Sequence, residues 1–142
     1  MNFTQVETQF LAHFGRGDHP VLAALRQQLA GAEVADRELT RAGVRVTLAV
    51  SAAAPRMPLD STMFGDVGFL HPEAPTGGGA VLFVHEGYAQ ALDIACYVDD
   101  WPRDEAAFNV HYLRRDGVPP DAGPGLVPAA ERDMSWFIES LS

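Results

Sequence analysis

The sequence contains no lysine, so its ten strongly basic residues are all arginine. Nineteen acidic residues outnumber them, and the net charge is −9. Binding to phosphate backbones and to anionic membrane surfaces depends largely on Lys and Arg side chains. We therefore expect neither nucleic acid nor a membrane as a direct partner of this chain.

Long apolar runs and a leader pattern are also absent. No stretch approaches the roughly 20 apolar residues that span a bilayer. The first ten residues contain no basic side chain and no apolar segment of the secretory type. Cys96 is the only cysteine, which excludes an internal disulfide bond and fits a reducing compartment. Together these features predict a cytoplasmic protein.

What the chain does have is enough apolar material for one core. Its 142 residues, 47% of them hydrophobic, predict a single domain over residues 1–142. The charge is uneven, because residues 1–71 carry 7 acids and 6 arginines, whereas residues 72–142 carry 12 acids and 4 arginines. The second half therefore has a net charge of −8. Such a surface keeps a protein soluble, and it also attracts a basic protein partner.

Helical spacing of apolar residues is found near both ends of the chain. It predicts a helix over residues 2–14 and a second over residues 18–30, where Asp18 is in the N-cap position. A closing helix is expected from about Pro128. Its apolar side chains would be Met134, Phe137, Ile138 and Leu141.

Between the helices, alternation of apolar and polar residues predicts strands. The expected strands are residues 33–39, 44–50, 66–70, 80–85, 88–98 and 107–113. Residues 51–64 are expected to form an irregular loop with a short helical turn at 61–64, and Gly77–Gly79 is expected in the connection that follows the strand 66–70. Residues 116–125 are rich in Pro and Gly and are expected to form a loop. The chain is thus predicted to be α+β, with an antiparallel sheet of five or six strands, two N-terminal helices and one C-terminal helix.

No catalytic or cofactor motif is convincing. The run Thr76–Ala80 leads into a strand and lacks the lysine of a phosphate-binding loop. Cys96 alternates with apolar residues, which favours core packing over nucleophilic chemistry. The spacing of His71, His85 and His111 matches no compact zinc pattern. We therefore expect no catalytic residue, no metal and no cofactor. This favours a non-catalytic protein over an enzyme, and the question stays open.

Acidic residues gather in one predicted loop beside a tryptophan and a proline. An EF-hand order of ligands is missing from this loop, which argues against a calcium site. Trp residues are frequent anchors of binding surfaces, although Trp101 can equally cover the edge of a core. The candidate partner-binding residues are Asp99, Asp100, Trp101, Asp104 and Glu105.

The segment Ala80–Pro102 resembles a strand pair that recurs in small, mostly uncharacterised bacterial proteins, some of which are thought to be immunity proteins of toxin systems. In those proteins the pair often ends with Leu-Glu-Ile/Val-Tyr before an acidic turn. Here Asp93 occupies the acidic position, and Ala95 and Cys96 intervene before Tyr97. The resemblance covers 23 of the 142 residues. It implies a non-catalytic binding protein and carries over no catalytic residue.

A second interpretation is a pocket protein or an enzyme on the cone-shaped nuclear-transport-factor-like fold, in which N-terminal helices precede a curved sheet. The two opening helices and the later strands suit this fold, whereas the closing helix and the Pro-rich loops suit it less well. Its polar pocket residues would be His85, Asp93, Tyr97 and His111. A third interpretation, a homo-oligomeric subunit, requires an exposed apolar strip.

Overall fold

The computed structural model describes residues 2–115 and 126–141, which form three α-helices, one 3-10 helix and a seven-stranded antiparallel sheet. The predicted α+β class is confirmed, with a slightly larger sheet than expected. The elements are α1 (Gln5–Gly15), α2 (Pro20–Ala30), β1 (Glu33–Leu39), β2 (Gly43–Ala49), β3 (Thr62–His71), β4 (Ala74–His85), β5 (Tyr88–Cys96), η1 (Glu105–Ala107), β6 (Asn109–Arg115), β7 (Leu126–Ala129) and α3 (Met134–Glu139).

Both N-terminal helices begin with a side-chain cap. Thr4 and Glu7 form a capping box at α1, each side chain bonding the other residue's backbone N–H. At α2 the cap is His19, whose Nδ1 accepts a hydrogen bond from the N–H of Val21. The expected cap at Asp18 is therefore wrong by one residue, because the imidazole supplies the acceptor that a carboxylate was predicted to supply.

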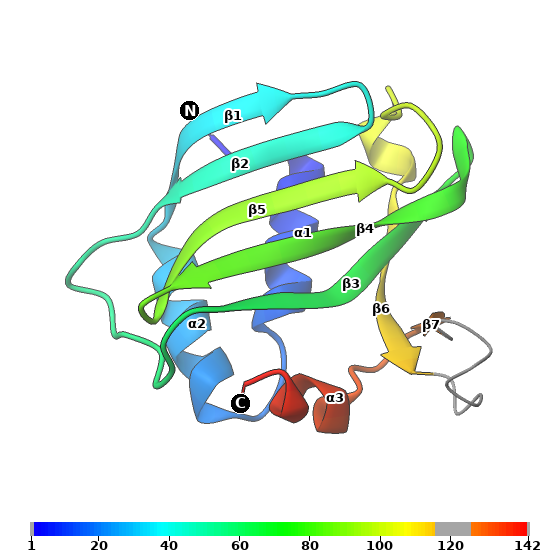
Figure 1. Ribbon diagram of the computed structural model, residues 1–142. Coiled ribbons are helices and arrows are strands. Elements are labelled where there is room, and N and C mark those ends of the chain that lie inside the picture. The colour runs from blue at the N-terminus through cyan, green and yellow to red at the C-terminus, as the bar shows by residue number, and fades with distance from the viewer. Residues whose placement is uncertain (1, 116–125, 142) are drawn as a thin grey trace.

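The sheet has the strand order β1-β2-β5-β4-β3-β6-β7, so β5 lies between β2 and β4. Helices α1 and α2 lie side by side against one face, behind the sheet in Figure 1. Apolar side chains from both layers fill the space between them. The largest fully buried ones are Phe10, Phe14, Leu22, Leu25, Phe64, Phe69, Leu82, Leu92 and Ile94. The sheet and helices thus enclose a packed core.

Strand β3 and strand β4 differ from the prediction. Residues 61–64, expected as a helical turn, include the start of β3 at Thr62, which pairs with Val84. Gly77–Gly79 was expected in a connection but belongs to β4. A Cβ at Gly78 would lie 2.2 Å from the carbonyl oxygen of Ala95 and 2.5 Å from the ring of Phe69. Glycine is present here because the neighbouring strand and the core approach closely.

The C-terminal segment also differs. The helix expected from Pro128 begins instead at Met134, where Asp133 caps it by accepting a hydrogen bond from the N–H of Trp136. Residues 126–129 form the edge strand β7, paired with β6. Proline lacks a backbone donor, and an edge strand tolerates this. The loop predicted at residues 116–125 lies outside the described residues.

Candidate partner-binding face

One face of the sheet carries no helix among the described residues (Figure 1). We call this side the outer face. Because side chains alternate along a strand, the residues between the core positions point to it. Register places Thr47, Ala91, Phe83 and Met63 next to one another across β2, β5, β4 and β3. Phe83 is half-buried and Met63 is 59% exposed, so apolar surface remains open there.

An ion pair lies in the middle of the outer face. Nη1 of Arg45 donates to Oδ2 of Asp93 at 2.8 Å, and the guanidinium lies over the ring of Phe83, 5.2 Å from its centroid. The other carboxylate oxygen, Oδ1 of Asp93, is buried and has no hydrogen-bond partner among the described residues. Arg, Phe and Met side chains of this kind are enriched in the cores of protein interfaces.

Tyr97 extends this apolar surface toward one end of the sheet. Its hydroxyl lies 3.0 Å from where a Cβ of Gly79 would be, so the tyrosine covers the bare backbone of β4. The side chain is nevertheless 59% exposed, and the adjacent Val98 is 74% exposed. Partial burial raises the pKa of the Tyr97 hydroxyl. A tyrosine hydroxyl is protonated near neutral pH even without this shift, so it is available as a donor. Tyr97 is therefore an exposed, amphipathic side chain of the type that binding surfaces use as an anchor.

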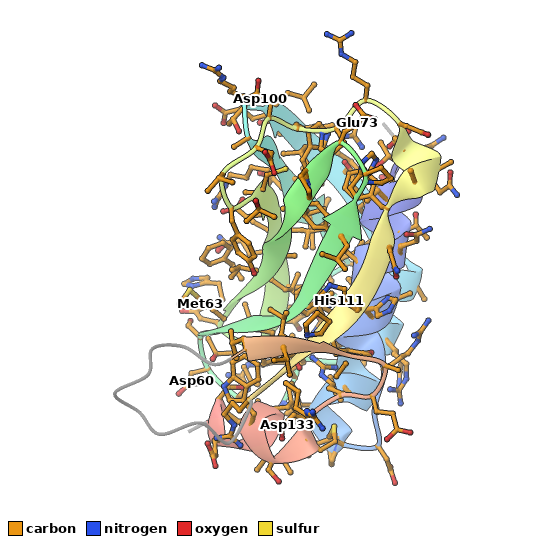
Figure 2. All side chains as sticks on the ribbon, turned by 90° about the vertical axis from the view of Figure 1, so that its right-hand side faces the viewer. Asp60, Met63, Glu73, Asp100, His111 and Asp133 are labelled. Atoms are coloured by element: carbon orange, nitrogen blue, oxygen red, sulfur yellow. The ribbon has the colours of Figure 1, made fainter. Side chains whose placement is uncertain are left out.

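Acidic side chains from two separate loops gather at the end of the sheet where β5 leads into Tyr97. Glu73 comes from the β3–β4 turn, and the others come from the loop between β5 and β6. Figure 2 shows Glu73 and Asp100 at the same end of the molecule. We call this group the acidic end, and it consists of Glu73, Asp99, Asp100, Asp104 and Glu105.

Hydrogen bonds hold the two loops together. Nε2 of the buried His71 bonds the carbonyl of Asp104 at 2.7 Å, while its Nδ1 accepts from the N–H of Glu73. The Glu73 carboxylate accepts from the N–H groups of Arg103 and Asp104, both at 3.3 Å. His71 thus has a structural role, since both of its ring nitrogens are engaged. The acidic end is built in advance of any partner.

Trp101 and the aspartates around it also make internal contacts. The Trp101 ring packs on Phe69 and Phe108, with centroids 6.1 and 5.1 Å away, so it covers the edge of the core. Asp100 pairs with the exposed Arg41 at 2.9 Å. Asp104 caps η1 through the N–H of Ala106. Of the predicted acidic residues, Glu105 is exposed and forms no ion pair with a described residue, although its charge acts on Arg37.

Of the four polar residues of the pocket interpretation, three lie on strands β4, β5 and β6, and Tyr97 follows the end of β5. No cavity found among the described residues is lined by all four. His85 lines a depression of about 640 Å³ beside the β4–β5 hairpin, with Arg56, Asp60 and Tyr88. His111, labelled in Figure 2, lines a different one of about 400 Å³ at the open edge of β6. Asp93 and Tyr97 line neither of these. The structure therefore brings Asp93 and Tyr97 together on the outer face and leaves the two histidines at its margins.

The surroundings of Cys96 do not favour a reactive thiol. Burial, together with the nearby negative charges of Asp99 and Asp100, raises the pKa of the Cys96 thiol, which disfavours the nucleophilic thiolate. Within residues 2–115 and 126–141, no three His, Cys, Asp or Glu side chains are placed to hold a metal ion. Over the same residues, no helix is long and apolar enough to cross a membrane.

Some residues of this face were missed at the level of sequence. Val81 and Phe83 alternate with the core residues Leu82 and Val84, and that alternation was a usable signal. The role of Arg45 required the register that sets it opposite Asp93. Comparison with known proteins adds nothing to this geometry, because no family model, curated protein or solved structure matches the chain.

Proposed function

We propose that this protein is a non-catalytic, immunity-like binding module that binds a basic protein through the acidic end and the adjoining outer face. The observation that carries the proposal is the exposed pair Tyr97 and Val98, which directly precedes Asp99 and Asp100 in a loop that hydrogen bonds to the Glu73 turn. An aromatic anchor surrounded by charged groups is the usual anatomy of a protein interface. The acidic end would attract the partner, and Tyr97 would supply buried area.

The distribution of ion pairs supports a basic partner. Six arginines of the described residues are already engaged with acids, namely Arg37, Arg41, Arg45, Arg56, Arg115 and Arg132. At the acidic end, by contrast, Glu73, Asp99 and Glu105 form no ion pair with any arginine of the described residues. Their charges are therefore less fully compensated than those of the paired acids, and the charge of Glu105 also acts on Arg37. Acidic surfaces of this kind accelerate association with positively charged partners.

The first experiment is native mass spectrometry of the untagged protein purified from its own cells. The proposal expects a heterocomplex with one basic protein, which the same experiment would identify. A monomer or homodimer carrying only a small added mass would contradict it and would favour the pocket interpretation instead.

The second experiment tests the surface with a matched control. The variant Asp100→Arg/Glu105→Arg changes charge at the acidic end, and Asp18→Arg/Glu131→Arg makes the same change at exposed sites in the α1–α2 and β7–α3 loops. We expect the first variant to slow association with the partner by about tenfold at low salt, and the second to have a much smaller effect. Equal effects of the two variants, or association indifferent to salt, would refute a role for the acidic end.

A further inference from the structure

The outer edge of β1 is an unpaired row of backbone groups. β1 is the terminal strand of the sheet and bonds only to β2. Its seven residues are mostly exposed, and no hydrogen bond within the described residues engages its outward N–H and C=O groups. An edge of this length is a template on which an extended chain can form a further strand.

The opposite edge of the sheet is much less suited to this. β7 has only four residues, and Pro128 among them has no N–H to donate. It pairs with Tyr112–Arg115 and leaves only Asn109–His111 of β6 uncovered. Short strands, proline, charged side chains and β-bulges all hinder edge pairing. β1 has charged side chains and one register shift, between Val34 and Asp36, but it has seven residues and no proline. The two edges therefore differ, and β1 is the one that remains open.

Charge selects what the open edge can accept. Glu33, Asp36 and Glu38 are exposed and form no ion pair with a described residue. The only base on the strand, Arg37, is turned to the helix side, where it holds Glu7 at 2.6 Å. A second copy of β1 would set like charges opposite one another, which is unfavourable. An extended segment rich in Lys or Arg would meet opposite charges instead.

The β1 edge is continuous with the acidic end. The turn that follows β1 carries Arg41, whose side chain pairs with Asp100 and whose carbonyl accepts from the N–H of Trp101 at 2.9 Å. One end of a strand added to β1 would therefore lie near the loop that we assign to partner binding. In Figure 1, β1 borders the sheet with no element on its far side.

We infer that β1 accepts an extended basic segment of the partner as an eighth strand of the sheet. This inference rests on the proposed function for the basic character of the partner and adds the mode of its binding. Backbone hydrogen bonds would supply affinity, and Asp36 and Glu38 would select positive side chains on the outer face. The same acids would keep two copies of the chain from pairing at this edge.

The test mixes the intact protein with each of three capped heptapeptides. Binding is monitored by amide hydrogen exchange and by NMR chemical shifts of the protein. The first peptide alternates Lys and Val, the second alternates Glu and Val, and the third is the Lys-Val peptide with every second amide N-methylated. We expect the Lys-Val peptide to bind and to protect amides of β1. The acidic peptide should not bind, and N-methylation should weaken binding by about tenfold or more, because several hydrogen bonds are lost.

A variant of β1 gives a second readout. Asp36→Asn/Glu38→Gln should lower the affinity for the Lys-Val peptide by about threefold at low salt. The control variant Asp18→Asn/Glu131→Gln should leave this affinity unchanged. Equal binding of the methylated peptide, or protection confined to Tyr97–Glu105, would overturn strand addition and leave the proposed function standing. Failure of the proposed function itself is seen separately, when reversal of Asp100 and Glu105 leaves association with the natural partner unchanged.

Discussion

The two faces of the sheet differ in how completely their side chains are buried and their polar groups are hydrogen-bonded. On the covered face, the buried polar groups have partners: Gln28 uses its whole amide and Glu7 its whole carboxylate. On the outer face, Phe83 is half open and Asp93 keeps an oxygen without a partner among the described residues. Stability explains the first arrangement but does not require the second. Substitutions on the covered face should therefore unfold the protein, whereas those on the outer face should affect binding.

Two ion pairs, one on each face, allow the largest expected difference to be tested. Arg132 and Asp66 are 4% and 6% exposed, and Arg132 also donates to the carbonyls of Phe14 and Arg16 at the end of α1. Arg45 and Asp93 on the outer face are 48% and 36% exposed. Water screens the second pair and not the first.

We expect Arg132→Ala to lower the free energy of unfolding by about 3–5 kcal/mol, because it leaves the Asp66 carboxylate buried without its cation. Arg45→Ala should lower it by less than about 1 kcal/mol. Urea unfolding followed by circular dichroism measures both. Similar losses for the two variants would show that the outer pair is as structural as the buried one.

The next largest effect concerns neighbouring glutamines of α2. Gln28 is buried and bridges the helix to the carbonyls of Pro55 and Gly87 and to the N–H of Ala89. Gln27 is exposed. Gln28→Ala leaves the buried N–H of Ala89 without a partner and removes a donor from the Pro55 and Gly87 carbonyls, of which Gly87 keeps the N–H of Met57, so it should cost about 1–3 kcal/mol.

Gln27→Ala is the matched control and should be within about 0.5 kcal/mol of wild type in the same urea titrations. A small effect of Gln28→Ala would mean that water replaces the amide, and that the covered face is less tightly closed than its contacts indicate.

Gly78 and Gly79 are adjacent in β4 and point to opposite faces of the sheet, so substitutions at the two positions compare the faces within one strand. A Cβ at Gly78 would meet the Ala95 carbonyl at 2.2 Å, so Gly78→Ala should cost about 1–3 kcal/mol. At Gly79 the nearest atom is the hydroxyl of Tyr97 at 3.0 Å, at the end of a side chain that can swing away. Gly79→Ala should therefore change stability by less than about 1 kcal/mol. Equal melting temperatures would contradict this assignment of the faces.

Much of this architecture could be predicted because local patterns express it. The helix spacing of Phe10 and Phe14 and the alternation through Val44–Val50 reflect burial on one side, and that burial is what the structure shows. The glycine run of β4 misled because glycine normally signals a turn. Only the contact of Gly78 with Phe69 and with β5 explains it, and that contact joins residues distant in the sequence.

The candidate site was predictable only in part, for the same reason. The acids after β5 are adjacent in the chain and could be recognised together. Glu73 could not, because its link to Arg103 and Asp104 depends on two loops about 30 residues apart. The pairing of Arg45 with Asp93 likewise needed the order of strands, in which β5 lies beside β2. The alternation of residues along a strand predicts which side of the sheet a side chain faces. Which residues lie next to it depends on the order of the strands, and the sequence pattern does not contain that order.

The smallest expected effect is a pH dependence on the covered side. Burial lowers the pKa of His13 below its ordinary value near 6.5, and the positive charges of Arg16 and Arg132 act in the same direction. The unfolded chain therefore takes up a proton more readily than the folded protein does. The stability contribution is complete above about pH 6.5 and is lost as the pH falls toward the folded-state pKa.

His13→Gln should remove this dependence. Its free energy of unfolding should fall less than that of wild type between pH 7 and pH 5, as measured by urea titration at half-unit intervals. Identical slopes would show that the folded and unfolded states protonate His13 alike. In that case the ring would be open to water, and α1 would cover this end of the sheet less completely than the contact between His13 and Tyr112, 5.1 Å between centroids, implies.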